Sequence, residues 1–354
     1  MAEPSPSAGR RPPTIYDVAR AAGVAASTVS RAFSRPGRVN AETAERIRQV
    51  AADLGYRTNP LARALPTGRT SMLALVISDI TNPFYGEIIR GAQSAAAEAG
   101  YVILLVDAQE SDRVERDALE RALPTVEGVV LASSRMSDSA IRMTAKQRPM
   151  IVLNRHVADV PSVVTDNLHG MRLAVQHLAD LGHRTVTYVS GPEASWADGM
   201  RWRSLRKAAA ESRLRAHRTG PYPPTVAGGS TAAEELGHHG ASAVIAYNDQ
   251  LAIGLVRGLQ ATGRRVPQDV SIVSFDNIFA AELVTPGLTT VAAPLRAQGH
   301  TAVCSLLSAL GGAQVSTGRP MVLPTRLVVR GSTAPRGRGR PRPAALDGSA
   351  LDPR

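Results

Sequence analysis

Cysteine, aromatic residues and long apolar runs are scarce in this chain of 354 residues. The one cysteine, Cys304, cannot close an internal disulfide, and its apolar neighbours predict a small core residue rather than a nucleophile. No apolar run is long enough to cross a membrane, and the first residues hold no apolar segment of the kind that a secretory signal needs. We therefore expect a cytoplasmic protein without a membrane partner.

Motifs for phosphate, dinucleotide and metal binding are also missing. No GxxxxGK(S/T) loop occurs, no GxGxxG follows an apolar run, and no cysteines and histidines have the spacing of zinc ligands. Asp, His and Arg at strand ends can still support acid–base chemistry, so an α/β enzyme remains an alternative. Because nothing marks a nucleophile paired with a base, we predict no catalytic residue, no metal site and no cofactor.

The positive charge of the chain, +11 in total, is concentrated at its two ends. Residues 1–70 hold 11 Lys and Arg against 5 Asp and Glu, and residues 331–354 hold 5 against 2. The body between them, residues 71–330, is nearly balanced at 25 against 23. A solvated surface explains any single arginine, but this segregation favours a polyanion as the partner of the N-terminal segment.

Residues 14–34 predict two short helices joined by a turn. Thr14 is a favoured N-cap with Asp17 in the capping-box position, and Gly23 supplies the turn. The second helix begins near Ala25 or Ala26, with Val29 and Phe33 facing the first. Its outward residues are Ala26, Ser27, Ser30 and Arg31. Helix, glycine turn and helix is the pattern of a helix-turn-helix, whose second helix enters the major groove of DNA.

A third helix follows, and a shorter fourth one after it. Asn40 caps the third helix, which ends at Gly55; the residues that it buries are Ala44, Ile47, Ala51 and Leu54. The fourth starts at Asn59 and is stopped by Pro66, so it has little more than one turn. Helices this short are marginal in water, so we expect it to form only against a partner; a flexible linker is the alternative.

From Met72 onward the chain alternates short apolar runs with helical stretches. The runs are 72–77, 102–106, 128–132, 150–153, 185–189, 243–246 and 270–273. Their length and their lack of polar residues predict strands that are buried on both faces of a parallel sheet, with helices as crossovers. The body is therefore assigned to the α/β class, and a hydrophobic content of 44% is enough for a large core.

Polar residues stand at the ends of these runs, where open α/β sheets bind ligands. They are Asp79, Asp107, Asn154, Arg155, Asn248, Asp249, Asp276 and Asn277. For Asp79, Asp107 and Asp249 a role as caps of the following helices is an equal alternative. Arg155, and Arg201 further along, are harder to explain as caps.

Seven motifs together resemble the lactose-repressor (LacI) family. They are TIYDVARAAGV at 14–24, STVSR at 27–31, GYRTNP at 55–60, DITNPFY at 79–85, NDQLAIG at 248–254, VPQDVSIVSFD at 266–276 and LTTV at 288–291. The resemblance implies an all-α helix-turn-helix head and an α/β core of two doubly wound parallel-sheet lobes of periplasmic-binding-protein type. The implied segments are a disordered N-terminus (1–13), the head (14–58), a hinge helix and linker (59–70), an N-lobe (about 71–167 and 293–322) and a C-lobe (about 168–292 and 323–330).

The same resemblance implies two sets of binding residues. Those for DNA are Thr14, Tyr16, Ala26, Ser27, Thr28, Ser30, Arg31, Asn40 and Tyr56 in the head, and Asn59, Ala62 and Leu65 in the hinge. Those for a small effector between the lobes are Phe84, Tyr85, Arg201, Asn248, Asp276 and Leu295. To these we add Asp79, Asp107 and Arg155 from the strand ends, and Trp196, for which a place in the core is the commoner alternative. Three departures from the family pattern fall here: Asn154 in place of an acid, Ser274 in place of a glycine, and a short, proline-rich segment at 209–240.

Taken together, these features predict a homodimeric transcription regulator, in the first place a repressor, that binds a palindromic operator and a sugar or related metabolite. A solute-binding receptor and an α/β enzyme with a DNA-binding appendage are the alternatives. Residues 331–354 contain no apolar heptad, so we expect a dimer rather than a tetramer. Their arginines, flanked by Gly and Pro, fit either a minor-groove hook or a disordered solubilising tail.

Overall fold

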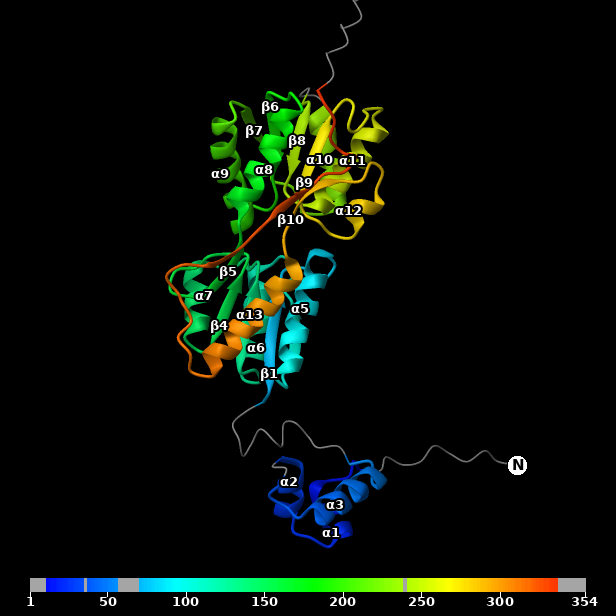
Figure 1. Ribbon diagram of the computed structural model, residues 1–354, viewed down its shortest axis with the longest axis vertical. Helices are drawn as coiled ribbons and strands as arrows, with labels where there is room; N and C mark the ends of the chain where they lie inside the picture. Colours follow the sequence, from blue (N-terminus) through cyan, green and yellow to red (C-terminus); the bar gives the residue numbers. More distant parts are fainter. Residues whose placement is uncertain (1–10, 35–36, 57–69, 238–240, 337–354) are drawn as a thin grey trace, which may run out of the picture. The chain divides into compact units, whose positions relative to one another are not determined.

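The computed structural model describes residues 11–34, 37–56, 70–237 and 241–336. The chain divides into two compact units, residues 1–70 and 71–354. The first unit contains three described helices, α1 (Ile15–Ala22), α2 (Ala26–Ser34) and α3 (Ala41–Asp53) (Figure 1). The predicted hinge residues Asn59, Ala62 and Leu65 lie outside the described residues, as does most of the basic tail.

Local hydrogen bonds set the ends of the three helices, as the sequence predicts. The Asp17 carboxylate accepts from the backbone nitrogen of Thr14 at 2.8 Å and from its hydroxyl at 2.7 Å. Gly23 adopts a φ of 66°, the left-handed conformation that ends α1. At the start of α3, the Asn40 side chain accepts from the backbone nitrogen of Glu42 at 2.9 Å. The core of the unit is centred on Val18, Val29 and Ile47, which are fully buried.

Two expectations about this unit are wrong. Leu54 is 41% exposed, because α3 stops at Asp53 and the chain turns away. Tyr56 comes back instead, and its ring packs 6.1 Å from that of Phe33. Ala26 is half-buried against the core of the unit, because it begins α2 on the side that faces α1.

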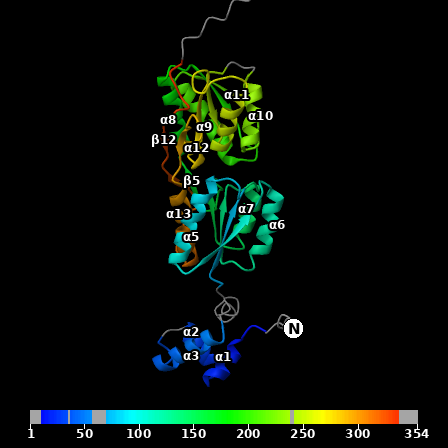
Figure 2. The same cartoon turned by 90° about the vertical axis from the view of Figure 1, so that its right-hand side faces the viewer.

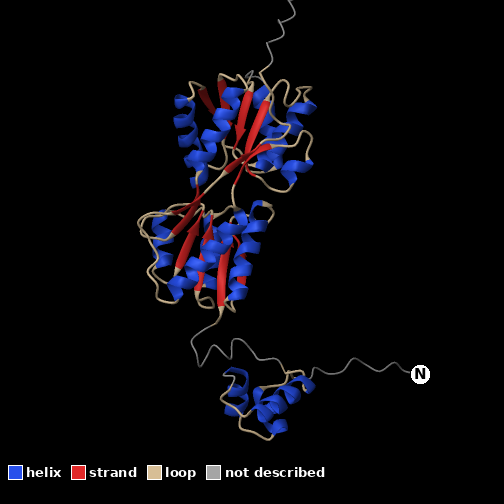
Figure 3. Ribbon diagram, in the orientation of Figure 1, coloured by secondary structure: helices blue, strands red, loops and turns tan. Residues whose placement is uncertain are grey.

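The second unit is built on two sheets, one for each lobe (Figures 1 and 3). The N-lobe strands are β1 (Met72–Ile77), β2 (Val102–Asp107), β3 (Gly128–Ala132), β4 (Met150–Leu153), β5 (Ser162–Thr165) and β11 (Met321–Leu323). The C-lobe strands are β6 (Thr185–Val189), β7 (Arg215–Thr219), β8 (Ala243–Ala246), β9 (Ser271–Asp276), β10 (Thr289–Ala292) and β12 (Arg326–Val328).

The order of the strands along the sheet is the same in the two lobes. The described strands run β11-β5-β4-β3-β1-β2 in the N-lobe and β12-β10-β9-β8-β6-β7 in the C-lobe. The N-lobe pairs are parallel, and in the C-lobe β12 pairs antiparallel with β10. The described chain passes between the lobes after β5, after β10 and after β11. Ligands of such sheets bind beyond the carboxyl ends of the strands, which here face the other lobe.

Helices cover both faces of each sheet (Figure 2). In the N-lobe, α5 (Phe84–Glu98) and α13 (Leu295–Leu310) pack on one face and α6 (Asp112–Ala122) and α7 (Asp138–Ala145) on the other. In the C-lobe, α8 (Asn167–Asp180) and α9 (Trp196–Glu211) face α10 (Val226–Gly237) and α11 (Asp249–Ala261) across the sheet, with the short α12 (Ala280–Leu283) beside α11. None of the described helices has the length and apolarity to cross a membrane.

Close packing joins α13 to α5, the helix that carries the predicted site residues Phe84 and Tyr85. A Cβ atom on Gly91 of α5 would lie 1.9 Å from the carbonyl oxygen of Arg296, and one on Gly299 of α13 would lie 1.9 Å from that of Ile88. Only glycine allows so close an approach at both positions.

On the outer side of α13, Cys304 is exposed, so its prediction as a core residue is wrong.

The seven predicted apolar runs are all strands, with small shifts at their ends. The expectation of burial on both faces fails at β2, an edge strand whose Val102 is 63% exposed. The apolar pattern missed β5, β7, β10, β11 and β12. These strands are short or carry polar residues, and β7 and β12 close the C-lobe sheet at its two edges, where burial is incomplete.

Candidate functional site

A cleft lies between the two lobes; together with the open solvent at its mouth it spans about 550 Å³. Both lobes contribute to the lining, which consists of Asn82, Phe84, Tyr85, Glu110, Ser133, Arg135, Asn154, Thr165, Asn167, Ala197, Arg201, Pro224, Tyr247, Asn248, Asp276 and Ala293. Polar groups with few aliphatic side chains therefore face the space.

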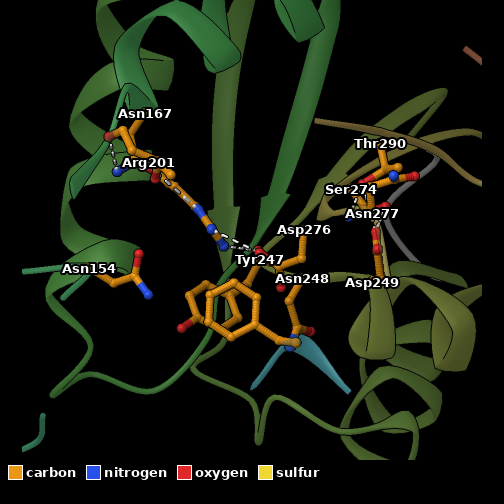
Figure 4. A network of polar contacts seen from close by, with 12 residues as sticks. Asn154, Asn167, Arg201, Tyr247, Asn248, Asp249, Ser274, Asp276, Asn277 and Thr290 are labelled. Carbon is orange, nitrogen blue, oxygen red and sulfur yellow. Dashed lines mark hydrogen bonds and ion pairs between the residues drawn. The ribbon is translucent and has the colours of Figure 1, made fainter. Parts of the chain in front are cut away.

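Arg201 is the centre of the C-lobe wall (Figure 4). It lies on α9 and is buried, with its Nε donating to Asn167 Oδ1 at 3.3 Å and its Nη2 to Asp276 Oδ1 at 3.2 Å. Its Nη1 donates to the carbonyl oxygen of Tyr247. The guanidinium also lies over two rings, 4.4 Å from the centroid of Phe275 and 5.1 Å from that of Tyr247. This side chain is thus held in one orientation.

Asp276 ends β9 with a backbone conformation that side chains rarely adopt. Its φ is 107°, and that of the next residue, Asn277, is 57°. Burial raises the pKa of the Asp276 carboxyl, and the neighbouring Arg201 opposes that rise without cancelling it. One carboxyl oxygen is bonded to Arg201, and the second oxygen is left for a ligand hydroxyl.

The N-lobe wall contains a second arginine–carboxylate pair. Arg135 Nε donates to Glu110 Oε2 at 2.6 Å, and Nη1 donates to the carbonyl oxygen of Ser133 at 3.2 Å. Burial raises the pKa of the neighbouring Tyr85 hydroxyl well above its usual value, so this hydroxyl is neutral. Phe84 packs edge-on against Tyr85 with ring centroids 5.0 Å apart, which gives this wall an aromatic surface.

Side-chain amides supply the remaining polar groups. Asn154, which lines the cleft, accepts at Oδ1 from Gln298 at 2.9 Å and donates from its amide nitrogen to Ser133 Oγ at 3.4 Å. Asn248 is committed twice, because it caps α11 by accepting from Leu251 at 2.9 Å and donates to Pro224 at 3.2 Å. The cleft therefore offers hydrogen-bond donors and acceptors in fixed positions.

Five of the ten predicted effector residues line this cleft: Phe84, Tyr85, Arg201, Asn248 and Asp276. The other five are not among the residues that line it. Asp79 and Asp107 hold the loop after β1, accepting from the backbone nitrogens of Thr81 at 2.8 Å and Ile80 at 3.1 Å. The alternative role, as caps of the following helices, is wrong for both, because Pro83 stands at the start of α5 and Ser111 caps α6.

The remaining three residues lie on other parts of the lobes. Arg155 donates to the carbonyl oxygens of Ser134 at 3.1 Å and Met136 at 2.6 Å and pairs with Asp138. Leu295 is buried in the core of the N-lobe. Trp196 lies at the start of α9, where its neighbour Ala197 lines the cleft in its place.

Sequence reasoning missed several lining residues. Arg135 and Glu110 come from loops with no recognisable motif, and Ser133 and Glu110 have φ values of 56° and 57° that no pattern signals. Tyr247 directly precedes the NDQLAIG motif, and this position is the one sequence feature that could have pointed to it. Its ring lies so close to Gly191 that a Cβ there would be 2.6 Å from a ring carbon.

The predicted DNA-contacting residues of the first unit occupy different settings. Ser27, Ser30 and Arg31 of α2 are exposed, Tyr16 is 68% exposed, and Thr28 is half-buried. Thr14 and Asn40 are engaged in the helix caps described above. Tyr56 is half-buried, and this burial raises its pKa. Among the described residues no group of three or more His, Cys, Asp and Glu side chains forms a metal site.

Known proteins match both units. The model of the bacterial regulatory proteins of the lacI family matches residues 14–59, and that of the periplasmic binding protein-like domain matches residues 175–333. The HTH-type transcriptional regulator DegA of Bacillus subtilis is 32% identical over 338 residues, which cover 91% of this chain and 98% of DegA. The chain belongs to the LacI family.

Solved structures of LacI-family proteins share the fold. The lac repressor dimer bound to operator and the anti-inducer ONPF matches with a TM-score of 0.82 and 26% identity, over 92% of this chain and all of that chain. A LacI family transcriptional regulator from Enterococcus faecium with bound ribose matches with a TM-score of 0.67 and 32% identity, over 75% of this chain and all of that one. This LacI-family protein is a DNA-binding transcriptional regulator and not an enzyme.

Proposed function

We propose that this LacI-family regulator is a cytoplasmic, homodimeric repressor whose effector is a neutral, polyhydroxylated molecule such as a sugar or nucleoside. The observation that carries this proposal is the pairing of charges in the cleft. Each lining arginine already has a carboxylate partner, Glu110 for Arg135 and Asp276 for Arg201. A phosphate or carboxylate ligand would have to compete with these partners, whereas hydroxyl groups can bond to the oxygens and amides that remain.

The aromatic residues of the cleft support the same ligand class. Phe84 and Tyr85 on the N-lobe wall and Tyr247 on the C-lobe wall offer faces for a sugar ring or a base. A regulator from Enterococcus faecium with the same fold holds ribose. A ligand that touches both walls also biases the separation of the lobes, which is the way in which such a site controls a DNA-binding unit.

A binding panel with the purified chain tests this proposal. Pentoses, hexoses, disaccharides and nucleosides are compared with their phosphate esters by calorimetry, and the protein's DNA sites are selected from genomic fragments with and without each hit. We expect one neutral compound to bind saturably and to change recovery of a palindromic site. Asp276→Asn should abolish this binding, while Asp269→Asn, on an exposed ion pair of the same lobe, should not. Binding only of phosphate esters would overturn the proposed ligand class.

For the operator we propose that Arg31 provides most of the base-specific contact of α2. The other outward side chains of this helix are small, and methyl or single hydroxyl contacts discriminate weakly, while an arginine can bond bidentately to guanine. Arg31→Ala should relax specificity at one position of each half-site by about 1–3 kcal/mol. Arg48→Ala removes a cation from α3 that is paired with Glu45 and serves as the matched control.

The segment limits and the basic tail remain proposals of the same kind. We propose a hinge at residues 59–70 and lobes that divide near residues 167, 292 and 322. For residues 335–354, deletion should flatten the salt dependence of operator binding if the arginines enter the minor groove. An unchanged slope would favour a solubilising tail.

A further inference from the structure

A buried polar cluster lies next to the Asp276 end of the cleft without lining it (Figure 4). Asp249 opens α11 and is fully buried. Its Oδ1 accepts from the hydroxyls of Ser274 and, at 2.7 Å, Thr290, and its Oδ2 accepts from the backbone nitrogen of Ile278 at 2.8 Å. One carboxylate thus joins α11 to β9, to β10 and to the turn after β9.

That turn carries Asp276 and is held by the cluster at two successive amides. The Ile278 amide donates to Asp249 directly. The Asn277 amide donates to Thr290 Oγ1 at 3.3 Å, and the Thr290 hydroxyl in turn donates to Asp249. Asp276 and Asn277 have positive φ values of 107° and 57°, which persist only where the surroundings hold them. The hydrogen bonds of the buried cluster hold this turn from the interior of the C-lobe.

We propose that Asp249 is a positioning residue of the effector site, which fixes the turn that aims the Asp276 carboxylate at Arg201. The part of this inference that concerns the effector rests on the proposed function. The part that concerns Asp276 and Arg201 rests on the hydrogen bonds alone. Asp249 contacts neither the cleft nor Arg201, so its effect passes through the turn.

Asp249 has a shifted pKa, which a residue with a purely structural role would not need. Burial raises the pKa of Asp249 to about 7, the charge of Asp276 adds to the rise, and the donors from Ser274, Thr290 and Ile278 oppose it. Other charged groups around the turn are Arg201, which pairs with Asp276, and Arg330, which donates to Asn277 Oδ1 at 2.9 Å and lies 3.7 Å from Glu282.

A proton on Asp249 changes the hydrogen bonding of the turn. If it sits on Oδ2, the Ile278 amide loses its acceptor. If it sits on Oδ1, the hydroxyl of Ser274 or Thr290 must turn around and accept. Either way the hold on residues 276–278 weakens as the pH falls through about 7, the pKa of Asp249. Ser274 stands where the family pattern has a glycine, so its donor is an addition of this chain that favours the charged form.

The experiment follows backbone and side-chain protons in the full-length protein without any effector. Transverse-relaxation-optimised NMR spectra record the amides of Asn277 and Ile278 and the Nε–H of Arg201 as a function of pH. We expect the three signals to titrate together with a midpoint near pH 7. Asp249→Asn should remove the titration and shift the Arg201 signal. The matched control is Asp269→Asn, which changes an exposed carboxylate of the same lobe and should alter none of them.

Two further variants keep the test decisive if Asp249→Asn fails to fold. Thr290→Val removes the relay to Asn277 with little change of shape, and it should shift the Asn277 and Arg201 signals. Ser274→Gly removes a donor to the charged form and should move the common midpoint to higher pH. Circular dichroism and thermal melting check that each variant is folded.

Signals that do not titrate together, or an Arg201 signal that is unchanged in a folded Asp249→Asn or Thr290→Val protein, would overturn the inference. The proposed function is judged separately by the ligand panel, because these spectra contain no effector. D-ribose is added in a second series. If it binds, Asp249→Asn should weaken it about tenfold at pH 8, since one charge-assisted contact is misplaced; equal affinity would contradict the effector part alone.

Discussion

The two walls of the cleft present the same pair of groups in different surroundings. In the C-lobe, the Arg201 and Asp276 side chains are only 9% and 7% exposed. In the N-lobe, Arg135 is 6% exposed, but its partner Glu110 is 26% exposed. Both partners of the Arg201–Asp276 pair are shielded from solvent, whereas Glu110 in the Arg135–Glu110 pair is partly exposed. A charge that is shielded from water depends more strongly on its partner than an exposed one. We therefore expect removal of the arginine to destabilise the C-lobe wall more than the N-lobe wall.

A second carboxylate lies behind each pair. Behind Asp276 lies the buried carboxylate of Asp249, tied to two strands and a helix. Arg135 is flanked by Glu115, whose Oε2 accepts from its backbone nitrogen at 3.0 Å and whose pKa is raised by burial. Both walls therefore have a buried carboxylate behind them, and what sets the N-lobe wall apart is the partly exposed Glu110. We infer that the C-lobe wall fixes the ligand and the N-lobe wall tunes which ligand is accepted.

The largest expected effect comes from removing one arginine from each wall. Arg201→Ala leaves the Asp276 carboxylate buried without a partner, and we expect it to lower the free energy of unfolding by about 3–5 kcal/mol and to abolish effector binding. Arg135→Ala leaves Glu110 next to solvent, and we expect a loss of about 1–3 kcal/mol. Urea unfolding of both variants at pH 7.5 measures the difference. Equal losses would mean that the two walls are equivalent.

An intermediate effect concerns the pH dependence of stability. Because the pKa of Asp249 is about 7 in the folded chain and its usual value is 3.8, the folded state binds the proton more tightly than the unfolded state. The Asp249 contribution to stability is therefore greatest below about pH 4 and is lost as the pH rises toward 7, by about 2–4 kcal/mol. The measurement compares urea unfolding of the natural chain and Asp249→Asn from pH 4 to 8. Parallel curves for the two proteins would contradict the shifted pKa.

Much of the fold was predictable because its signals are local. Helix caps such as Thr14 with Asp17, and apolar runs such as residues 72–77, depend on neighbours in the sequence alone. The edge strands β7 and β12 were not predicted, because strands that are only partly buried lack a continuous apolar run. Leu54 was misassigned because helical periodicity was extended past the point where α3 ends. Periodicity shows which face is buried but does not show where a helix stops.

The cleft was predictable only for residues that the family resemblance implies. Arg201 and Asp276 lie 75 positions apart; Asp276 ends one of the seven motifs, and the resemblance as a whole implies Arg201. Arg135 and Glu110 meet across 25 positions, and neither stands in a motif, so the second ion pair was invisible in the sequence. From the sequence Asp249 is either a ligand group or a helix cap, but Asn248 caps α11. The bonds of Asp249 to Thr290 and Ile278 depend on strand order and on a turn with positive φ values.

The smallest expected effect tests the tuning role of the N-lobe wall. Glu110→Gln keeps an acceptor for Arg135 but removes the charge that neutralises it, and we expect a loss of stability of only about 1 kcal/mol because Glu110 reaches solvent. The cleft then holds one uncompensated cation, which should favour an anionic ligand. The measurement is the ratio of the affinities for D-ribose 5-phosphate and D-ribose, which should rise about tenfold as one charge-assisted contact becomes available. Glu87→Gln, which removes an exposed carboxylate on α5 near Arg90, is the matched control and should leave the ratio unchanged. If Glu110→Gln also leaves it unchanged, the N-lobe pair does not set the ligand's charge, and that role falls to the C-lobe wall alone.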